Sequence, residues 1–492
     1  TPSLAGRGGR NRRGIIDQFP AGPPNSSSSR SLKPIATQDA NKIPVTANGA
    51  PGPALNAGPA MVLSLLLGVI TTWIFYPGLM SFDSIYQYRQ VVGDLAIRNY
   101  QPPVMVYAWK LGHALFGPGA MLIFHQFLYW TGIALIATCI HEKNRVRIPL
   151  VVVLGLLPPL WIHSATVWND VGVTSSFLFA VGCTMLLART GARWAFTCAA
   201  LALIYGLLAK RSALFAAVPL LFCLADAWFS SAPRRGGESG GNRSRIPILA
   251  MGLFTTALLA GWAIGSLGVE RMTKWGTIAV WDLAAVSLRE ERLLIPRSAL
   301  NVKDESEAAS LARLQDAFEP HLNGTLVRAA SLFPESNKKE LFDAWLALPL
   351  RYPGSYLGHR STVFLGLLGT PWNTMNLPYQ HELHGNDFGL QLAHADSRFF
   401  QQVLAWVEAS VKTPFYKPWL YLGLLLTAVV YALTRRGWTM NFTGRFPLYL
   451  GISGLLYLFP LFILAPATDF RYTLWMVASS VVLTAYTLFH PH

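Results

Sequence analysis

Charged side chains are scarce in this chain of 492 residues, because Asp, Glu, Lys and Arg together make up only 13% of it. Soluble proteins carry about 25% charged residues. With hydrophobic residues at 52%, this shortage excludes an ordinary water-soluble globular protein. The apolar residues gather in blocks such as Ala60–Gly78 and Ile248–Gly268, each close to the roughly 20 residues that a helix needs to cross a bilayer. Since backbone groups in lipid must pair internally, we expect these blocks to be membrane-spanning helices.

Cysteine is also rare, and close cysteine pairs are absent. The four cysteines are Cys139, Cys183, Cys198 and Cys223, all within apolar blocks. Their spacing matches neither a zinc site nor a redox motif, so we expect small apolar packing residues. The chain shows no convincing internal repeat either, although repeated halves are typical of transporters.

Acidic residues are fewer than basic ones, 25 against 40, which gives a net charge of +15. Such a charge can indicate nucleic-acid binding, but the cations here fill the N-terminal tail and alternate connections between apolar blocks. The connecting cations are Lys143, Arg145 and Arg147; Arg189 and Arg193; Arg234, Arg235, Arg243 and Arg245; and Arg435, Arg436 and Arg445. By the positive-inside rule these connections are cytoplasmic, and the pattern argues against a nucleic-acid partner.

This sidedness predicts an all-α polytopic membrane protein of about ten spans with both termini in the cytoplasm. Residues 1–59 are rich in Gly, Pro, Ser and Arg and predict a disordered basic cytoplasmic tail. Residues 60–268 form an N-terminal transmembrane module of about seven spans, with a first outer loop at 80–118. Residues 269–416 form a polar extracytoplasmic segment, and residues 417–492 contain about three more spans.

Both non-spanning parts are expected to contain helices. In the first outer loop, residues 82–93 and 103–115 are amphipathic and predict helices along the outer surface. In the extracytoplasmic segment, residues 304–319 and 335–349 are periodic, and Ser336 is a possible N-cap for the second.

Several ionisable residues fall on the outer side of this topology. They are Asp83, Asp170, Lys210, Arg211, His359, Arg360, Asp469 and Arg471. Ionisable groups near the bilayer are costly, so each is a functional candidate. Outer cations run against the positive-inside bias, and a lipid phosphate would offset their placement, because Arg binds it through paired hydrogen bonds and Lys as a point charge. The alternative is that they bind ordinary lipid headgroups or pair with Asp170 and Asp469.

The order of short motifs along the chain resembles bacterial GT-C glycosyltransferases, which use polyprenyl-phosphate sugars as donors. These motifs are Phe82-Asp83-Ser84 after the first span, Pro102-Pro103, Trp168-Asn169-Asp170 at the next outer turn, and Asp469-Phe470-Arg471-Tyr472 before the last span. The likeness covers residues 60–230 and 416–490. It implies a GT-C-like helical bundle in the bacterial inner membrane, with its active site on the extracytoplasmic side.

The resemblance implies an inverting transfer of one sugar to a hydroxyl of a glycan, lipid or protein acceptor. Its catalytic residues would be Asp83, as the base that accepts the hydroxyl proton, and Asp170. The donor phosphate would be bound by cations that stabilise its growing charge, namely Lys210, Arg211, Arg360 and Arg471. Further substrate contacts would come from Tyr100, Gln101, His359, His381, Glu382, Asp469 and Tyr472.

The chain departs from the family pattern in its first outer loop. Many members have paired acids there, whereas this loop offers Asp83 alone beside Ser81, Phe82 and Ser84, and the common His before Pro-Pro is replaced by Tyr100-Gln101. A single acid favours independence from metal, so we expect no cofactor, with a divalent metal as the alternative. The string His381-Glu382-Leu383-His384 is not the His-Glu-x-x-His of zinc proteases, and we interpret it as polar loop residues.

Two other functions stay open. A glycan polymerase or ligase would also take lipid-linked donors, but would not especially need Asp83. A lipid-glycan transporter or flippase would place charges midway through its spans and show repeated halves.

Overall fold

The computed structural model describes residues 57–231, 243–272, 275–300, 305–324, 338–370, 376–435 and 441–490, all within one unit, Pro51–His492. In this part of the chain every regular element is a helix, and strand pairing is limited to isolated β-bridges. The expected N-terminal tail, up to residue 56, and Ser336 lie outside the described residues. An all-α architecture is therefore confirmed for the part that is described.

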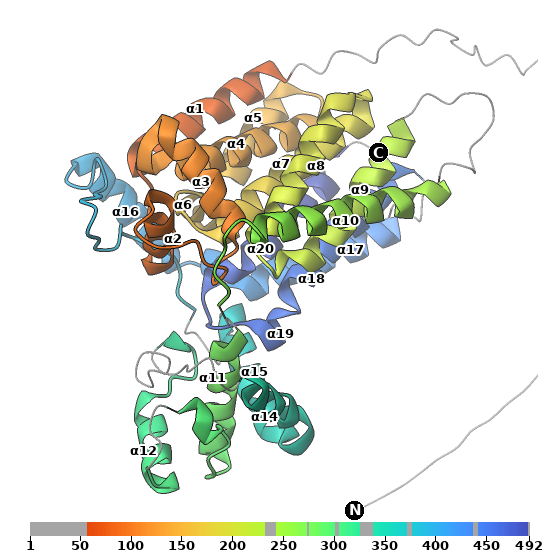
Figure 1. Cartoon of the computed structure of the whole chain (residues 1–492). Coiled ribbons are helices and arrows are strands. Elements are labelled where there is room, and N and C mark those ends of the chain that lie inside the picture. Colours follow the sequence, from red (N-terminus) through yellow and green to blue (C-terminus); the bar gives the residue numbers. More distant parts are fainter. Residues whose placement is uncertain are drawn as a thin grey trace, which may run out of the picture. The chain divides into compact units, whose positions relative to one another are not determined.

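Apolar helices form the bundle, and the short α19 lies at its edge beside α15 (Figure 1). They are α1 (Gly58–Phe75), α3 (Pro103–Phe116), α4 (Ala120–Ile140), α5 (Asn144–Gly155), α6 (Pro158–Ser164), α7 (Asn169–Thr190), α8 (Arg193–Ala209), α9 (Ala213–Ser231), α10 (Ile246–Gly265), α17 (Pro418–Arg435), α18 (Phe442–Leu458), α19 (Leu461–Leu464) and α20 (Leu474–Phe489). The other described elements are α2 (Phe82–Val92), α11 (Trp275–Arg289), α12 (Glu307–Ala317), α14 (Lys338–Arg351), α15 (Pro353–Leu368) and α16 (Arg398–Val411), with the 3₁₀ turns η1 (Gly117–Gly119), η2 (Arg243–Arg245), η3 (Arg297–Ala299), η5 (Pro414–Tyr416) and η6 (Phe470–Thr473).

Seven helical stretches in the described residues are long and apolar enough to cross a membrane. Each contains an apolar block that predicts a span, and Pro103–Ile140 also contains the expected surface helix at 103–115. They are Gly58–Phe75, Pro103–Ile140, Asn169–Thr190, Ala213–Ser231, Ile246–Gly265, Phe442–Leu464 and Phe470–Phe489. Membrane embedding, expected from the apolar blocks, is therefore supported by helices of the required length.

The other three expected spans are less regular. Helices α5 and α6 meet at a bend of 68°; α6 begins at Pro158, whose ring cannot continue the hydrogen bonds of a preceding helix. Helix α8 has 17 residues, and the apolar stretch of α17, Pro418–Thr434, is similarly short. If α5 and α6 count as one span, the total is eight, and the expected ten stays a prediction.

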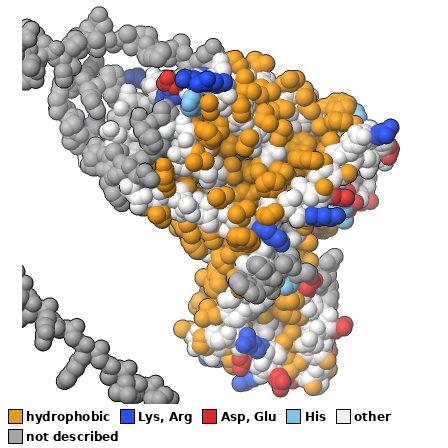
Figure 2. Space-filling model, turned by 180° about the vertical axis from the view of Figure 1, so that it is seen from behind, with side chains coloured by type: hydrophobic (Ala, Val, Ile, Leu, Met, Phe, Trp, Pro, Cys, Tyr) orange, Lys and Arg blue, Asp and Glu red, His pale blue; other side chains and the backbone are white. Residues whose placement is uncertain are grey.

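The bundle exposes large apolar side chains on its periphery, and small residues allow its inner helices to pack closely. Val62, Val69 and Trp262, on α1 and α10, are 67%, 66% and 75% exposed, and Figure 2 shows a broad hydrophobic face on the bundle. In the interior, α4 and α7 approach so closely that a Cβ added at Gly132 would lie 2.6 Å from the backbone nitrogen of Phe179. Small residues at such crossings are typical of membrane helix packing.

The first outer loop forms the two expected helices, α2 and α3. A sharp turn separates α3 from α4, because Gly117 adopts φ 59° and ψ −154°, and a Cβ added at Gly112 would lie 3.0 Å from the Ala120 side chain. The sequence Gly117-Pro118-Gly119 forms a 3₁₀ turn at this bend. Helices α12 and α14 correspond to the periodic stretches 304–319 and 335–349, and the N-cap of α12 is Ser306, whose side chain accepts the Ala309 amide at 3.2 Å.

Candidate functional site

Asp83 lies in the first turn of α2, where the local sequence favours a carboxylate. Ser81 is the N-cap, and Ser81 and Ser84 form a capping box. The positive end of the helix dipole points at this turn, which stabilises an anionic side chain. The capping residues also reach other elements, because Ser84 Oγ donates to the Val167 carbonyl at 2.8 Å and Trp168 Nε1 donates to Ser81 Oγ at 2.8 Å.

Backbone pairing brings this turn to the start of α7. The Leu79 amide donates to the Ala165 carbonyl at 3.0 Å, and the Val167 amide donates to the Leu79 carbonyl at 2.9 Å. Asp170 follows three residues later, in the first turn of α7. Two acids that are 87 positions apart in the sequence are thus held at the same end of the bundle.

Lys210 caps the C-terminal end of α8 and forms an ion pair with Asp170. Its ammonium also lies over the Tyr472 ring, 4.5 Å from the centroid. Tyr457 Oη donates to Asp170 Oδ1 at 3.4 Å. The pair thus joins α7, α8, α18 and η6 at one point.

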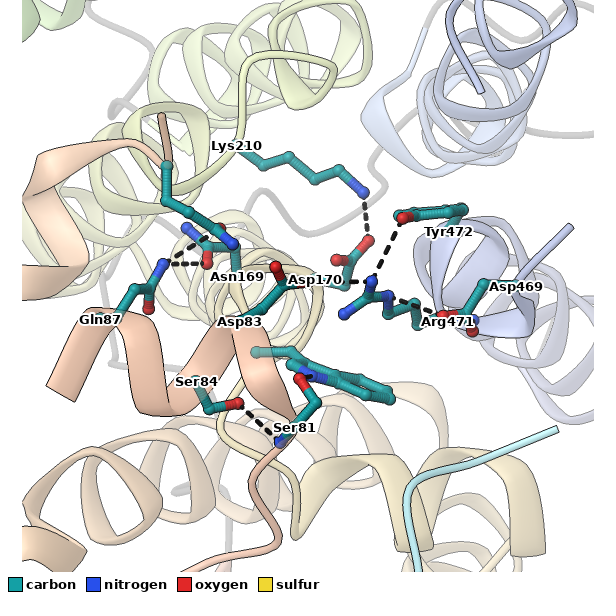
Figure 3. Close-up of polar contacts among 12 residues, drawn as sticks. Ser81, Asp83, Ser84, Gln87, Asn169, Asp170, Lys210, Asp469, Arg471 and Tyr472 are labelled. Carbon is teal, nitrogen blue, oxygen red and sulfur yellow. Dashed lines mark hydrogen bonds and ion pairs between the residues drawn. The ribbon is translucent and has the colours of Figure 1, made fainter. Parts of the chain in front are cut away.

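Arg471 lies between two carboxylates (Figure 3). Its Nη2 is 3.0 Å from Asp83 Oδ2, and its Nε is 2.8 Å from Asp469 Oδ2. The guanidinium is also 4.5 Å from the centroid of the Trp168 ring. A planar guanidinium can meet two acceptors and an aromatic face together, which a lysine cannot reproduce.

Amide side chains link the acidic turn to the rest of the site (Figure 3). Gln87 Nε2 donates to Asn169 Oδ1 at 2.6 Å and to Gln101 Oε1 at 3.0 Å. Asn169 Nδ2 donates to the Ala209 carbonyl at 2.7 Å, directly before Lys210. Helices α2, α7 and α8 are therefore connected through a single chain of hydrogen bonds.

These groups surround a cavity of about 420 Å³. Its lining includes nine of the thirteen residues that the sequence singled out: Asp83, Tyr100, Gln101, Asp170, Lys210, Arg211, Asp469, Arg471 and Tyr472. Three are carboxylates and three are cations. The Asp83 side chain is 35% exposed, against 7% for Asp170 and 10% for Asp469. Asp83 is thus the acid of the three most open to a bound molecule.

Burial shifts the pKa values of several cavity groups toward their neutral forms. It lowers the pKa of Lys210, an effect that the neighbouring carboxylate of Asp170 opposes. It raises the pKa of the Asp469 carboxyl, against the pull of the Arg471 guanidinium. Burial likewise raises the pKa of Tyr100, and the negative charge of Asp83 adds to the rise. Tyr100 therefore keeps its hydroxyl proton at neutral pH.

The four remaining candidates lie outside this lining. His359 and Arg360, on α15, contact Asp282 of α11. His381 and Glu382 belong to the stretch that crosses the start of α2, where the Met80 amide donates to the Glu382 carbonyl at 3.3 Å. Among the described residues no group of three or more His, Cys, Asp or Glu side chains is arranged to hold a metal ion.

A second cavity, of about 550 Å³, adjoins the first. Apolar residues of α3, α8, α9 and α10 line most of it, including Leu208, Leu214, Leu258 and Trp262. Pro102 and Arg211 belong to both linings, and Arg271 also lines the second cavity. We call this second cavity the apolar groove; it meets the polar cavity at Arg211, whose Nη2 donates to the Asn99 carbonyl at 2.9 Å.

A further apolar cavity, of about 490 Å³, lies between α1 and α4. It is lined by residues such as Leu65, Trp73, Phe127 and Trp130, and its lining contains no Asp, Glu, Lys or Arg. It has the polarity of a site for lipid chains but lacks the cations of the apolar groove.

Sequence reasoning did not assign a role to Gln87, Ser81 or Trp168. Gln87 carried a usable signal, because it follows Asp83 by four residues and therefore lies on the same face of α2. The indole of Trp168 had no such signal, since its contact with Arg471 joins helices that are far apart in the chain. Comparison of the chain with protein-family models, curated proteins and solved structures found no match.

Proposed function

We propose that this protein is an integral-membrane glycosyltransferase that transfers a sugar from a polyprenyl-phosphate donor to an acceptor hydroxyl, with inversion. The observation that carries the proposal is the junction of a polar cavity with an apolar groove at Arg211. A lipid-linked sugar has the same two parts. Its hydrocarbon chain fits the groove, its sugar fits the cavity, and its phosphate falls at the cation between them.

The polar cavity supplies a base for the acceptor. A sugar hydroxyl is a poor nucleophile near neutral pH, so a carboxylate must accept its proton as it attacks the anomeric carbon. Asp83 is the most exposed acid of the cavity and has this role in our proposal. Asp170 is mostly buried beneath Lys210, so we assign it the second role of holding that lysine in place.

The leaving group is the lipid phosphate. As the bond from the acceptor oxygen to the anomeric carbon forms, the bond from that carbon to the phosphate oxygen breaks, and its electron pair stays with the phosphate. Fixed cations stabilise this growing charge. Arg211 lies at the junction, Lys210, its neighbour in the chain, lines the polar cavity, and Arg471 lies beside Asp83. These cations allow the reaction without a metal.

The proposal includes an extracytoplasmic site and cytoplasmic termini, which the sidedness of the cations supports, and a bacterial inner membrane, which the family resemblance implies. A polymerase or ligase of lipid-linked glycans would use the same cations and groove. The proposal favours a single-sugar transferase because Asp83 is open to the cavity and paired to Arg471, as a base beside the reacting centre should be.

The test is to incubate purified wild-type protein and the Asp83→Asn variant with labelled polyprenyl-phosphate sugars and glycan, lipid and protein acceptors. We expect transfer by the wild type and a loss of roughly 10²- to 10⁴-fold in the variant. Asn keeps the shape of the Asp side chain and removes its charge. The matched control is Glu270→Gln, which makes the same carboxylate-to-amide change in an exposed ion pair with Arg98. Transfer at the wild-type rate by Asp83→Asn would contradict the assignment of Asp83 as the base.

Metal removal is a second check of the same mechanism. Protein treated with EDTA is expected to transfer sugar at the untreated rate, because protein cations meet the charge of the phosphate. A loss of activity that Mg²⁺ or Mn²⁺ restores would contradict the assignment of that role to Arg211, Lys210 and Arg471.

A further inference from the structure

A fully buried ion pair lies outside the cavity, between two helices of the 269–416 segment. Arg360 Nη2 of α15 is 2.6 Å from Asp282 Oδ2 of α11, and both side chains are 0% exposed. Trp345 Nε1 of α14 donates to the same carboxylate oxygen at 2.7 Å, and His359 Nε2 lies 3.1 Å from Asp282 Oδ1. Burying two charges is costly, and replacing such a pair by apolar residues is often neutral or stabilising. Its presence calls for a role beyond stability.

The other terminal nitrogen of Arg360 contacts the loop formed by residues 465–469, which leads to Arg471. Arg360 Nη1 donates to the Ala465 carbonyl at 2.9 Å. Ala465 follows α19, and four residues later the chain reaches Asp469, which holds Arg471 in the cavity. The guanidinium therefore connects α11 to Ala465, the first residue of the loop.

The rest of the loop is paired to other parts of the same segment. The Thr468 amide donates to the His321 carbonyl at 3.0 Å, and the Phe470 amide donates to the Leu377 carbonyl at 3.0 Å. Residues 322, 323 and 377 also line the cavity. The conformation of residues 465–469 is thus set by the polar segment, to which Arg360 adds a contact with a fully buried charge.

We propose that Arg360 is a positioning residue: bridging Asp282 and the Ala465 carbonyl, it fixes the loop so that Asp469 holds Arg471 beside Asp83. This assigns Arg360 a role different from phosphate binding, since its guanidinium is fully buried and already bonded on both arms. The expected change in the transfer rate rests on the proposed function, whereas the expected change in the conformation of the loop does not.

The direct test is Arg360→Lys. Lysine keeps the charge opposite Asp282 but lacks the planar fork that spans two acceptors. The matched control is Arg445→Lys, because Arg445 forms a comparable pair with buried Asp226, at 2.8 and 2.5 Å, between α18 and α9. A general cost of replacing a paired arginine would appear in both variants.

Hydrogen exchange of the backbone amides gives a readout that needs no substrate. In Arg360→Lys we expect the amides of Thr468 and Phe470 to exchange about 10-fold faster, because the loop opens locally more often. The Gly172 amide, which donates to the Trp168 carbonyl in α7, should be unchanged, and Arg445→Lys should leave all three unchanged. Unaltered exchange at Thr468 and Phe470 would overturn the proposal.

The kinetic readout separates positioning from binding. Arg360→Lys should lower kcat about 10- to 100-fold through misplacement of Arg471, with a change in the donor KM below about threefold. A raised donor KM at constant kcat would instead support phosphate binding and contradict positioning. If the wild type transfers no sugar, the proposed function fails while the exchange result still decides the role of Arg360.

A double variant covers the case in which Arg360→Lys does not fold. Asp282→Leu with Arg360→Met removes both charges and keeps their apolar volume, a change that buried pairs tolerate. It should fold and show the same faster exchange at Thr468 and Phe470. Wild-type exchange in this folded variant would also overturn the proposal.

Discussion

At the scale of single residues, the charged side chains of the cavity form defined ion pairs with one another. Lys210 pairs with Asp170, and Arg471 pairs with both Asp83 and Asp469. The sequence placed all five on one side, because sidedness follows from hydropathy and cation placement. It could not say which acid meets which cation, since those pairings depend on side-chain directions at the ends of four different helices.

The pH dependence of the transfer rate should report the titration of Lys210. Burial lowers its pKa, so as the pH rises Lys210 loses its charge earlier than an exposed lysine, and Asp170 then lacks a partner. The rate should fall on the alkaline side. Arginine stays charged throughout this range, so Lys210→Arg should shift the alkaline limb of the pH–rate profile to higher pH. An unshifted limb would mean that another group titrates there.

At the scale of helices, the start of α2 is held by its capping serines. Replacing Ser84 by Ala removes its bond to the Val167 carbonyl and half of the capping box. We expect a loss of about 1 kcal/mol in unfolding free energy, together with slower transfer, because Asp83 is in the same turn. Thermal unfolding and the transfer rate measure the two effects. A stability loss without a rate change would separate the cap from the site.

Helix α10 offers a test of the apolar groove. Gly265 lines it, and a Cβ there would meet no atom within 4 Å, so Gly265→Phe adds a bulky side chain to the groove from a position with free space at the Cβ. We expect a higher KM for long-chain donors and little change for donors with a short, soluble chain. Gly252 of the same helix also has open space but lies outside the groove, which makes Gly252→Phe the control. Equal effects of the two variants would argue against chain binding there.

At the scale of the whole molecule, the sequence predicted the all-α architecture and nine of the residues that line the cavity. Helices of about 20 apolar residues are readable from composition alone. The roles of Arg360 and His359 were not readable, because their partner, Asp282, is 77 or more residues away and has no motif around it. Their burial arises from the packing of α11 against α15, a tertiary contact that no local pattern reports.

The central claim is that one amphiphilic site holds a lipid phosphate, with the chain in the apolar groove and the phosphate at Arg211. It can be tested before the sugar or acceptor is known. The measurement is photolabelling of the protein in bilayers with polyprenyl phosphate that carries a diazirine near the phosphate, followed by peptide mapping. We predict saturable labels on α3, α8 and α10, displaced by unlabelled polyprenyl phosphate and reduced by Gly265→Phe. Labelling that does not saturate, or that maps to the cavity between α1 and α4, would contradict the account.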